Sequence, residues 1–386
     1  MIFECFASVK IKKRIQLEYI LYHFPSARPT FVAMAGITEI LIDWYRHNKR
    51  DLPWRSSRDP YRIWLSEVIL QQTRVNQGLA YYYRFLESFP DVGALAEAEE
   101  EEVLKVWQGL GYYSRARNLH HTAKVIANER KGEFPADYQG LLALKGIGEY
   151  TAAAIASIAF NEAVPVIDGN VARVLSRLFG MHEAVNSSSG LKTLKSISLQ
   201  LISSLYPADY NQAIMEFGAL FCKPSNPDCP ECPLKHHCVA FQKDEVSSLP
   251  VKKAKQAARD LYIYYLAMTC LVDKEEHILI HKRAGKGIWE NLYDFPAIES
   301  SSPMELGEVL KKAELSKALS VSNYLVNSVS PQYSHQLTHM NIRAVFIHII
   351  LQETFFGFEN CQWIKKKAMV DFPVPRLIEK WNYLWP

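Results

Sequence analysis

Hydrophobic residues recur with helical spacing from Ile37 to about Ala240. Short connections that contain Pro or Gly separate the periodic segments. These segments are 37–48, 60–89, 100–110, 114–132, 151–160, 170–180 and 191–206. The pattern predicts an all-helical domain.

The pattern changes to strands after residue 260. Runs rich in β-branched and aromatic residues occupy 261–273, 276–283, 324–329 and 341–351, and a Lys-Glu turn joins the first two. Helical spacing returns near 303–320 and 375–384. We therefore expect an α+β domain here, and the polar, basic segment 243–260 predicts a linker in front of it.

The composition agrees with two domains and excludes a membrane protein. The 386 residues exceed the usual length of one core, 48% are hydrophobic and 22% are charged. No run of about 18 uninterrupted apolar residues occurs. We expect a soluble globular protein that needs no membrane.

The charge is nearly balanced. The formal net charge is +3, and the first 34 residues alone carry this excess. Global charge therefore does not argue for nucleic acid, so a DNA-binding function must rest on local groups. Residues 1–36 form an N-terminal extension without the apolar core and cleavage site of a signal peptide, and Met34 is a candidate for the true start.

A glycine-rich turn precedes one predicted helix. In "LKGIGEYTA", residues 144–152, Gly146 and Gly148 allow backbone conformations and close approaches that a Cβ would block. The helix that follows presents unpaired N–H groups and a positive dipole end. Such a turn suits a phosphate, although a tight helical turn that binds nothing has the same sequence pattern.

Four of the seven cysteines are clustered within a Pro-rich segment. Cys222, Cys229, Cys232 and Cys238 are separated by six, two and five residues. This clustering indicates a reducing compartment and a metal site rather than disulfides. Four thiolates fit either a tetrahedral zinc ion or an iron–sulfur cluster, and the spacing alone does not choose between them.

These motifs together resemble DNA glycosylases of the helix-hairpin-helix superfamily. The resemblance rests on the glycine turn, the Asp-Gly-Asn turn at 168–170 and the cysteine loop. The segments "LPWR", "SEVILQQTRV" and "QGLGYYSRARNLH" extend it to MutY-type adenine DNA glycosylases over about residues 37–386. The resemblance implies base-excision repair, in which adenine mispaired with 8-oxoguanine or guanine is removed from duplex DNA. It also implies one [4Fe-4S] cluster on the four cysteines.

Two carboxylates are candidates for breaking the N-glycosidic bond, which requires an acid near the base and a negative charge near the sugar. Glu67 lies among apolar residues of a helix that Asp59 and Pro60 open, so its pKa should be raised. The resemblance makes Glu67 the acid and Asp168 the carboxylate that stabilises the sugar. The alternatives are a solvated glutamate on an amphipathic helix and a simple helix N-cap.

Further site residues follow from the resemblance. Tyr150 and Asn170 support catalysis, and Trp54 and Arg55 line the adenine pocket. Gln72 and Tyr112 fill or wedge the base stack, because the adenine must be flipped out of the duplex. Lys145, Gly146 and Gly148 contact DNA.

Tyr150 separates two enzyme classes. Bifunctional relatives carry a lysine at this position, which forms a Schiff base and leads to strand cleavage, whereas a phenol cannot. Lys145, which replaces the usual proline of the motif, is a remaining candidate for weak lyase activity.

The C-terminal region resembles the Nudix-like domain of MutY proteins, which recognises 8-oxoguanine. The clustered glutamates of a Nudix hydrolase are missing, so we expect recognition without pyrophosphate hydrolysis. The turn that contacts the lesion corresponds to Leu337, Thr338 and His339. Another register would use residues 333–335, and a polar hairpin without a ligand is the third interpretation.

The predicted organisation has five parts. They are an N-terminal extension (1–36), a helical glycosylase domain with a helix-hairpin-helix (37–221), an iron–sulfur loop (222–242), a linker (243–260) and a Nudix-like domain (261–386). The predicted function is monofunctional adenine removal, and the alternatives are a bifunctional glycosylase/lyase and a non-catalytic iron–sulfur DNA-binding module. We expect a monomer that binds duplex DNA with an adenine mispair, in the cytoplasm at the nucleoid if the source is bacterial.

Overall fold

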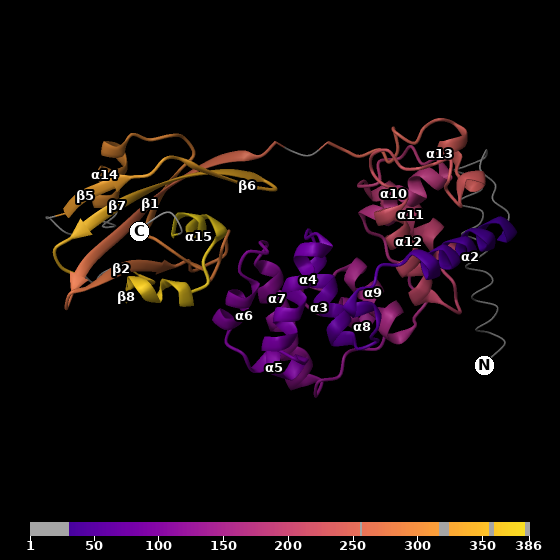
Figure 1. The fold of residues 1–386 in the computed structure, drawn as a ribbon, viewed down its shortest axis with the longest axis horizontal. Coiled ribbons are helices and arrows are strands. Elements are labelled where there is room, and N and C mark those ends of the chain that lie inside the picture. The colour runs from indigo at the N-terminus through magenta and orange to yellow at the C-terminus, as the bar shows by residue number, and fades with distance from the viewer. Residues whose placement is uncertain (1–30, 255–256, 316–323, 355–358, 383–386) are drawn as a thin grey trace. The chain divides into compact units, whose positions relative to one another are not determined.

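The chain forms two compact units in the computed structural model (Figure 1), and each unit combines two stretches of sequence. The first unit comprises Met1–Val68 and Glu133–Ala254, and the second comprises Ile69–Gly132 and Lys255–Pro386. The structure describes residues 31–254, 257–315, 324–354 and 359–382. Most of the predicted N-terminal extension and the ends of the predicted helices 303–320 and 375–384 lie outside the described residues.

The first unit is helical, as the periodicity predicts. Its helices are α2 (Phe31–Asn48), η1 (Pro53–Arg55), most of α3 (Pro60–Leu70), α8 (Tyr138–Leu142), α9 (Glu149–Phe160), α10 (Gly169–Phe179), α11 (Ser188–Leu201), α12 (Pro207–Leu220), η2 (Lys235–His237) and α13 (Val239–Gln242). Helix α9 is buried along nearly its whole length. Its alanines leave little side-chain volume, so neighbouring helices approach it closely.

Four helices form the N-terminal part of the second unit. They are α4 (Val75–Ser88), α5 (Val92–Glu97), α6 (Glu100–Trp107) and α7 (Ser114–Glu129). The expectation of continuous helical structure over 60–89 was wrong, because the chain leaves the helix between α3 and α4. Gln72 there has a left-handed φ of 58°. No Gly or Pro marks this break in the sequence; tertiary contacts impose it.

The C-terminal part of the second unit contains a mixed sheet. Its elements are β1 (Arg259–Val272), β2 (Glu275–Lys282), β3 (Tyr293–Asp294), β4 (Ala297–Ser300), α14 (Leu306–Leu315), β5 (Tyr324–Val329), β6 (Tyr333–Leu337), β7 (Met340–Leu351), β8 (Cys361–Lys365), η3 (Lys366–Asp371) and α15 (Arg376–Asn382). The strand order is β3-β2-β1-β7-β5, with β4 on β1, β6 on β7 and β8 on β2. Strands β1 and β7 pair in parallel, and the other pairs are antiparallel.

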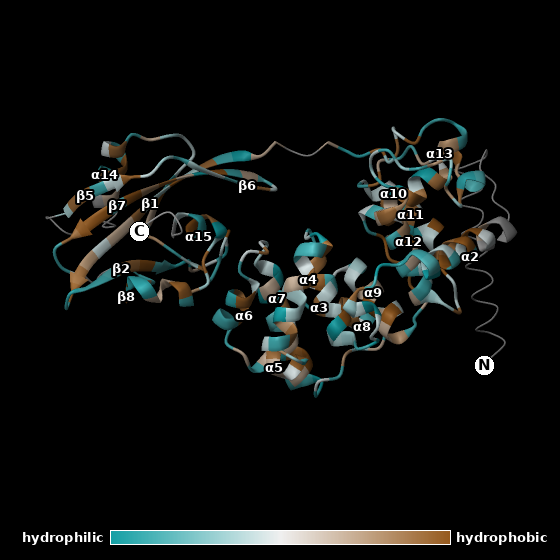
Figure 2. Cartoon of the chain, viewed as in Figure 1, coloured by the Kyte–Doolittle hydropathy of each residue, from teal (hydrophilic) through white to brown (hydrophobic). Residues whose placement is uncertain are grey.

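Alternation along β1 directs its side chains to two layers. Leu266 and Met268 pack in a core with Val309 of α14. Tyr265, the residue before Leu266, points to the opposite face and stacks on Phe346 with the ring centroids 5.0 Å apart. Helices α14 and α15 thus cover opposite faces of the sheet (Figure 1), and hydrophobic residues follow β1 and β7 between them (Figure 2).

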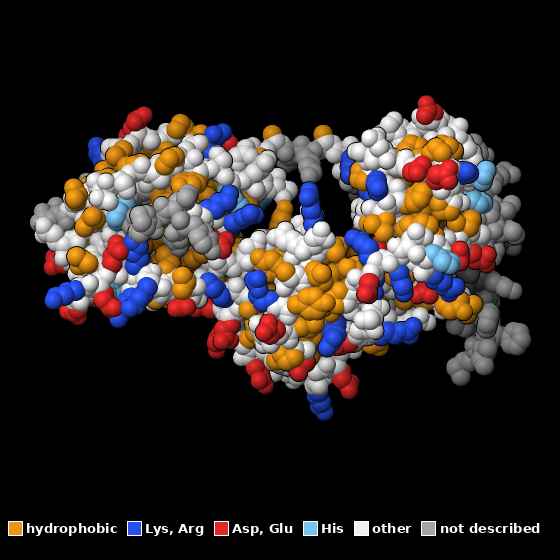
Figure 3. All heavy atoms as spheres, viewed as in Figure 1, with side chains coloured by type: hydrophobic (Ala, Val, Ile, Leu, Met, Phe, Trp, Pro, Cys, Tyr) orange, Lys and Arg blue, Asp and Glu red, His pale blue; other side chains and the backbone are white. Residues whose placement is uncertain are grey.

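Within the second unit, α6 and α7 hold the C-terminal domain by polar contacts. Arg117 forms an ion pair with Glu290 at 2.9 Å, and Tyr293 donates a hydrogen bond to Glu101 at 2.7 Å. The face drawn in Figure 3 mixes basic and acidic side chains rather than forming a field of one sign. No helix among the described residues is long and apolar enough to cross a membrane.

Candidate active site

Glu67 is a buried acid on α3. Its side chain lies among apolar residues of the helix, and the residue is only 9% exposed. Burial raises the pKa of Glu67 to about 7; the charge of Asp168 raises it as well, while a hydrogen bond with Tyr150 and the charge of Arg55 lower it. At neutral pH this carboxyl group therefore carries a proton for much of the time.

Asp168 caps helix α10. One carboxylate oxygen accepts a hydrogen bond from the Val171 N–H at 2.7 Å, and the other accepts one from the Asn170 amide at 2.9 Å. Burial raises the pKa of Asp168, while these hydrogen bonds lower it. The Asp168 side chain thus caps helix α10 and also belongs to the candidate site, and hydrogen bonds hold both of its oxygens in fixed positions.

The charges of both acids, Glu67 and Asp168, act on the hydroxyl group of Tyr150. Burial raises its pKa well above the ordinary value, and the charges of Glu67 and Asp168 add to this effect. Its hydroxyl also lies 3.4 Å from the Met215 sulfur. The structure therefore brings Glu67, Tyr150 and Asp168 into one site, although they are far apart in the sequence.

Asn170 connects this site to the cysteine loop through Arg173. The Asn170 side-chain oxygen accepts a hydrogen bond from Arg173 at 2.9 Å. The same guanidinium donates to the carbonyl oxygens of Gly218 at 2.7 Å and Cys222 at 2.8 Å. Arg173, which the sequence interpretation missed, thus holds the Asp168 turn, α12 and the first cysteine together.

Gly218 allows α12 to approach this turn closely. A Cβ at Gly218 would lie 2.7 Å from the Asn170 Cβ and 3.0 Å from the Asn170 carbonyl oxygen. Real Cβ atoms do not approach other atoms so closely, so any side chain here would displace Asn170. Nothing in the sequence marks this glycine apart from others in helices.

Asn211 supports the segment that leads to Asp168. Its fully buried amide donates to the Ser157 hydroxyl at 2.8 Å and the Val164 carbonyl at 2.9 Å, and its oxygen accepts from the Val166 N–H at 3.1 Å. A polar residue among apolar neighbours in α12 was the available signal. The sequence interpretation did not use it.

Arg55 is engaged by a second buried glutamate, Glu216. The Arg55 guanidinium donates to both Glu216 oxygens at 2.8 and 2.7 Å, and Arg50 donates to the same carboxylate. Burial alone would raise the pKa of Glu216, but the hydrogen bonds from Arg55 and Arg50 lower it to about 2. Trp54, the other predicted pocket residue, is buried on η1.

The predicted phosphate-binding turn connects α8 to α9. Leu144 and Ile147 are buried and anchor the turn, while Lys145, Gly146 and Gly148 are exposed. Gly146 has a φ of +80°, and a Cβ at Gly148 would meet nothing within 4 Å. The backbone beside Gly148 is therefore open to an approaching ligand.

Gln72 and Tyr112 lie on exposed loops of the second unit. Both have left-handed backbones, with φ values of 58° and 49°. The Tyr112 hydroxyl lies 2.8 Å from the Thr338 hydroxyl. The structure thus brings a predicted stack-wedging residue together with a predicted lesion-contacting residue.

Leu337, Thr338 and His339 lie at the turn between β6 and β7. Leu337 ends β6, and the other two residues form the exposed turn. Residues 333–335, the other register, lie within β6. Tyr333 packs against Phe346 at 5.6 Å and His335 against Trp289 at 5.9 Å, so their rings are engaged inside the domain.

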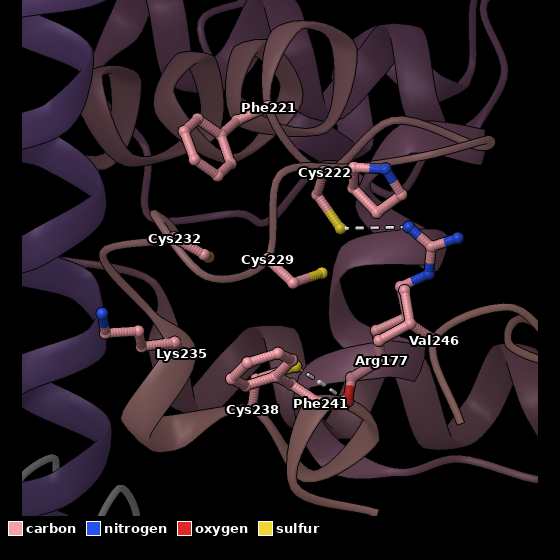
Figure 4. A pocket seen from close by; sticks show the side chains of 10 residues that line it. Arg177, Phe221, Cys222, Cys229, Cys232, Lys235, Cys238, Phe241 and Val246 are labelled. Carbon is pink, nitrogen blue, oxygen red and sulfur yellow. Dashed lines mark hydrogen bonds between the residues drawn. The ribbon is translucent and has the colours of Figure 1, made fainter. Parts of the chain in front are cut away.

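Cys222, Cys229, Cys232 and Cys238 surround one pocket (Figure 4). Phe221, Phe241 and Val246 add an apolar lining, and Arg177 lies 3.5 Å from the Cys222 sulfur. Burial, together with the charges of the neighbouring cysteines, raises the pKa of the Cys232 thiol to about 12. Four thiols converging in a dry pocket beside an arginine fit a group that binds them as thiolates.

Four cysteine side chains around one pocket suit either a tetrahedral zinc ion or an iron–sulfur cluster. Among the described residues, no three His, Cys, Asp or Glu side chains are placed to hold one metal ion.

Comparisons with known proteins agree with the motifs. Residues 65–197 match the family model described as HhH-GPD superfamily base excision DNA repair protein, and residues 267–381 match the NUDIX domain. A thermostable thymine-DNA glycosylase of known structure is 28% identical, with a TM-score of 0.51, and the match covers 54% of this chain and 97% of that one. The predicted fold class is confirmed.

The curated relatives are adenine DNA glycosylases. The protein from Buchnera aphidicola subsp. Schizaphis graminum is 31% identical over 350 residues, which is 89% of this chain and 96% of the relative. The protein from Buchnera aphidicola subsp. Baizongia pistaciae is 32% identical over 317 residues, or 82% and 86%. The chain therefore belongs to the adenine DNA glycosylase family, with a helical HhH-GPD domain followed by a NUDIX domain.

Proposed function

We propose that the chain hydrolyses the N-glycosidic bond of adenine opposite 8-oxoguanine or guanine, after base flipping and without cutting the strand. One observation carries this proposal: Glu67, Tyr150 and Asp168 share one site, and Glu67 has a pKa of about 7. Such a site offers a proton and a negative charge together at neutral pH. Those are the two groups that N-glycoside cleavage needs.

The proposed reaction has two stages. Glu67 donates its proton to a ring nitrogen of the flipped adenine, which leaves with the electron pair of the glycosidic bond. The Asp168 carboxylate stabilises the cationic sugar or bonds transiently to its anomeric carbon. Water then adds its hydroxyl to that carbon, and the proton it loses returns to a carboxylate. Asn170 holds Asp168 by the 2.9 Å hydrogen bond.

Tyr150 supports hydrolysis without strand cleavage. Burial and two nearby acids raise its pKa, so the phenol stays protonated, and it has no amine for a Schiff base. Lys145 is exposed on the glycine turn and remains the candidate for weak lyase activity.

The DNA contacts follow from the exposed loops. The glycine turn offers backbone N–H groups to a phosphate, with Lys145 beside it. Gln72 and Tyr112, the wedge pair, enter the base stack when adenine is extruded. Leu337, Thr338 and His339 contact 8-oxoguanine, and the contact between Tyr112 and Thr338 supports a shared role for the two loops. We expect the chain to act as a monomer.

The cysteine loop holds one [4Fe-4S] cluster in this proposal. Its support is the pocket that the four cysteines line and their Cys-x6-Cys-x2-Cys-x5-Cys interval, which resembles the cluster loop of MutY-type glycosylases. Anaerobically purified protein should show the broad visible absorbance of iron–sulfur charge transfer. The Cys222→Ser variant should lose that absorbance, and colourless zinc-containing protein would contradict the cluster.

One assay separates the three candidate functions. A duplex with adenine opposite 8-oxoguanine is incubated with the protein and analysed with and without alkali. Cleavage that requires alkali supports the proposed hydrolase, and cleavage without alkali supports a glycosylase/lyase. Intact DNA in both samples supports a non-catalytic DNA-binding module.

A further inference from the structure

The two residues of the wedge pair share an unusual backbone. Gln72 and Tyr112 both carry side chains at left-handed φ values, 58° and 49°. L-residues adopt this region at an energetic cost and remain there only where their surroundings hold them. Both residues are exposed, and Tyr112 is 52% exposed, so their own side chains bury little surface that could hold them there.

Arg115 contacts the peptide groups that precede both residues. Its Nη1 donates to the carbonyl oxygens of Gln71 at 2.6 Å and Ile69 at 3.1 Å, and its Nη2 donates to that of Gly111 at 3.1 Å. The Gln71 and Gly111 carbonyls belong to the peptide bonds that enter Gln72 and Tyr112. The φ angle describes rotation about the N–Cα bond, relative to the preceding peptide plane. Holding those two planes therefore restricts the φ angles of Gln72 and Tyr112.

The guanidinium itself is held firmly. It lies 4.9 Å from the Trp107 ring and 5.7 Å from the Tyr112 ring. The Trp107 indole N–H also donates to the Gly111 carbonyl at 3.0 Å. Arg115 is 9% exposed, and burial lowers its pKa to about 10, so it remains charged at neutral pH. A planar fork can bridge two loops in a way that a lysine ammonium cannot.

We propose that Arg115 is a positioning residue that fixes both members of the wedge pair in one geometry, so that they enter the base stack together. This inference rests on the proposed function. If the two loops are already ordered before DNA binds, less binding free energy is lost in ordering them when the adenine is unstacked. Arg115 itself lies below the surface and needs no contact with DNA.

The test compares two duplexes. One carries adenine opposite 8-oxoguanine, and the other carries a tetrahydrofuran abasic analogue in place of that adenosine, so no base must be extruded. For Arg115→Lys we expect the Kd of the adenine duplex to rise about tenfold, while the Kd of the abasic duplex stays within about twofold. Lys124→Gln, which removes an exposed charge from the same helix, should leave both values unchanged.

The ratio of the two dissociation constants separates positioning from folding. An unfolded fraction scales both apparent constants equally, and assays at reduced temperature keep a less stable variant folded. Equal weakening on both duplexes, or no weakening on either, would overturn the role of Arg115. If the wild type releases no adenine, the proposed function fails first; if it releases adenine and Arg115→Lys behaves like the wild type, only this inference fails.

Discussion

Two buried glutamates of the first unit show how neighbours decide what a carboxyl group does. Glu67 is 9% exposed and Glu216 is 1% exposed, so both side chains are largely shielded from bulk solvent. Glu216 receives hydrogen bonds from Arg50 and Arg55 and has a pKa of about 2. Glu67 faces Tyr150 and a second acid, Asp168, and has a pKa of about 7.

The two glutamates differ in how far neighbouring groups compensate their negative charge. Two arginines neutralise the Glu216 charge, which therefore supports the fold and is always present at neutral pH. The Glu67 charge lacks comparable compensation, so this side chain keeps its proton and can deliver it. A raised pKa of this kind is typical of a catalytic acid, whereas the lowered one is typical of a structural ion pair.

Replacing Glu67 tests the catalytic half of this comparison and should have the largest effect. Glu67→Gln removes the transferable proton, so single-turnover adenine release should fall by about 10²–10⁴-fold. The folded pKa of Glu67 is above its ordinary 4.5, so the wild type loses stability as pH rises from about 4.5 through 7. The free energy of unfolding of Glu67→Gln should therefore match the wild type near pH 4 and exceed it by about 3 kcal/mol at pH 8.

The proposed role of Glu67 requires both the loss of adenine release and the gain of stability at pH 8 in Glu67→Gln. Full adenine release by Glu67→Gln would refute the assigned acid. Lower stability at pH 8, measured by urea unfolding, would show that the charged form of Glu67 is compensated in the fold.

Replacing Glu216 tests the structural half. Glu216→Gln leaves Arg50 and Arg55 without their buried carboxylate, so the free energy of unfolding at pH 7 should fall by about 3 kcal/mol. Because the folded pKa of Glu216 is below its ordinary value, the difference from the wild type should shrink as pH falls from about 4.5 toward 2. Denaturant unfolding at several pH values measures this. An unchanged stability at pH 7 would contradict the structural role.

Gly218→Ala should test whether the site needs a fixed Asn170. The added Cβ displaces Asn170, and through it Asp168, so adenine release should fall by about tenfold or more. The free energy of unfolding should fall by about 1–2 kcal/mol, because the clash with Asn170 costs more than the helix propensity of Ala contributes. Gly36→Ala on α2, where a Cβ meets nothing within 4 Å, is the matched control and should keep full activity. Equal activity in both variants would show that Asn170 needs no fixed position.

Tyr150→Phe should give the smallest change. The Tyr150 hydrogen bond lowers the pKa of Glu67, so its loss should move the falling limb of the pH–rate profile to higher pH. The rate on the plateau should change only a few-fold, which is the worth of one hydrogen bond. A shift of the limb to lower pH would show that Tyr150 acts on Glu67 in another way.

The sequence was most informative where the chemistry is local. The Asp168 cap and the glycine turn each occupy a few consecutive residues, and the four cysteines all lie between residues 222 and 238. The elements around them follow from hydrophobic periodicity. Glu67 could be proposed because apolar neighbours on its own helix indicated burial.

The remaining parts depend on contacts between distant segments. Arg55 and Glu216 are 161 residues apart, and Asn211 reaches back 54 residues to Ser157. The break after α3 depends on Arg115, 44 residues beyond Gln71. A single sequence does not say which helices meet, so these residues could not be assigned from local pattern.

The pH dependence of adenine release tests the central claim most directly. Single-turnover rates on a duplex with adenine opposite 8-oxoguanine should be nearly constant between pH 5 and 6.5 and fall about tenfold per unit well above pH 7, because only protonated Glu67 donates. The residual rate of Glu67→Gln should show no such limb. A wild-type rate that stays constant or rises from pH 6 to 9 would contradict the assignment of Glu67 as the buried acid.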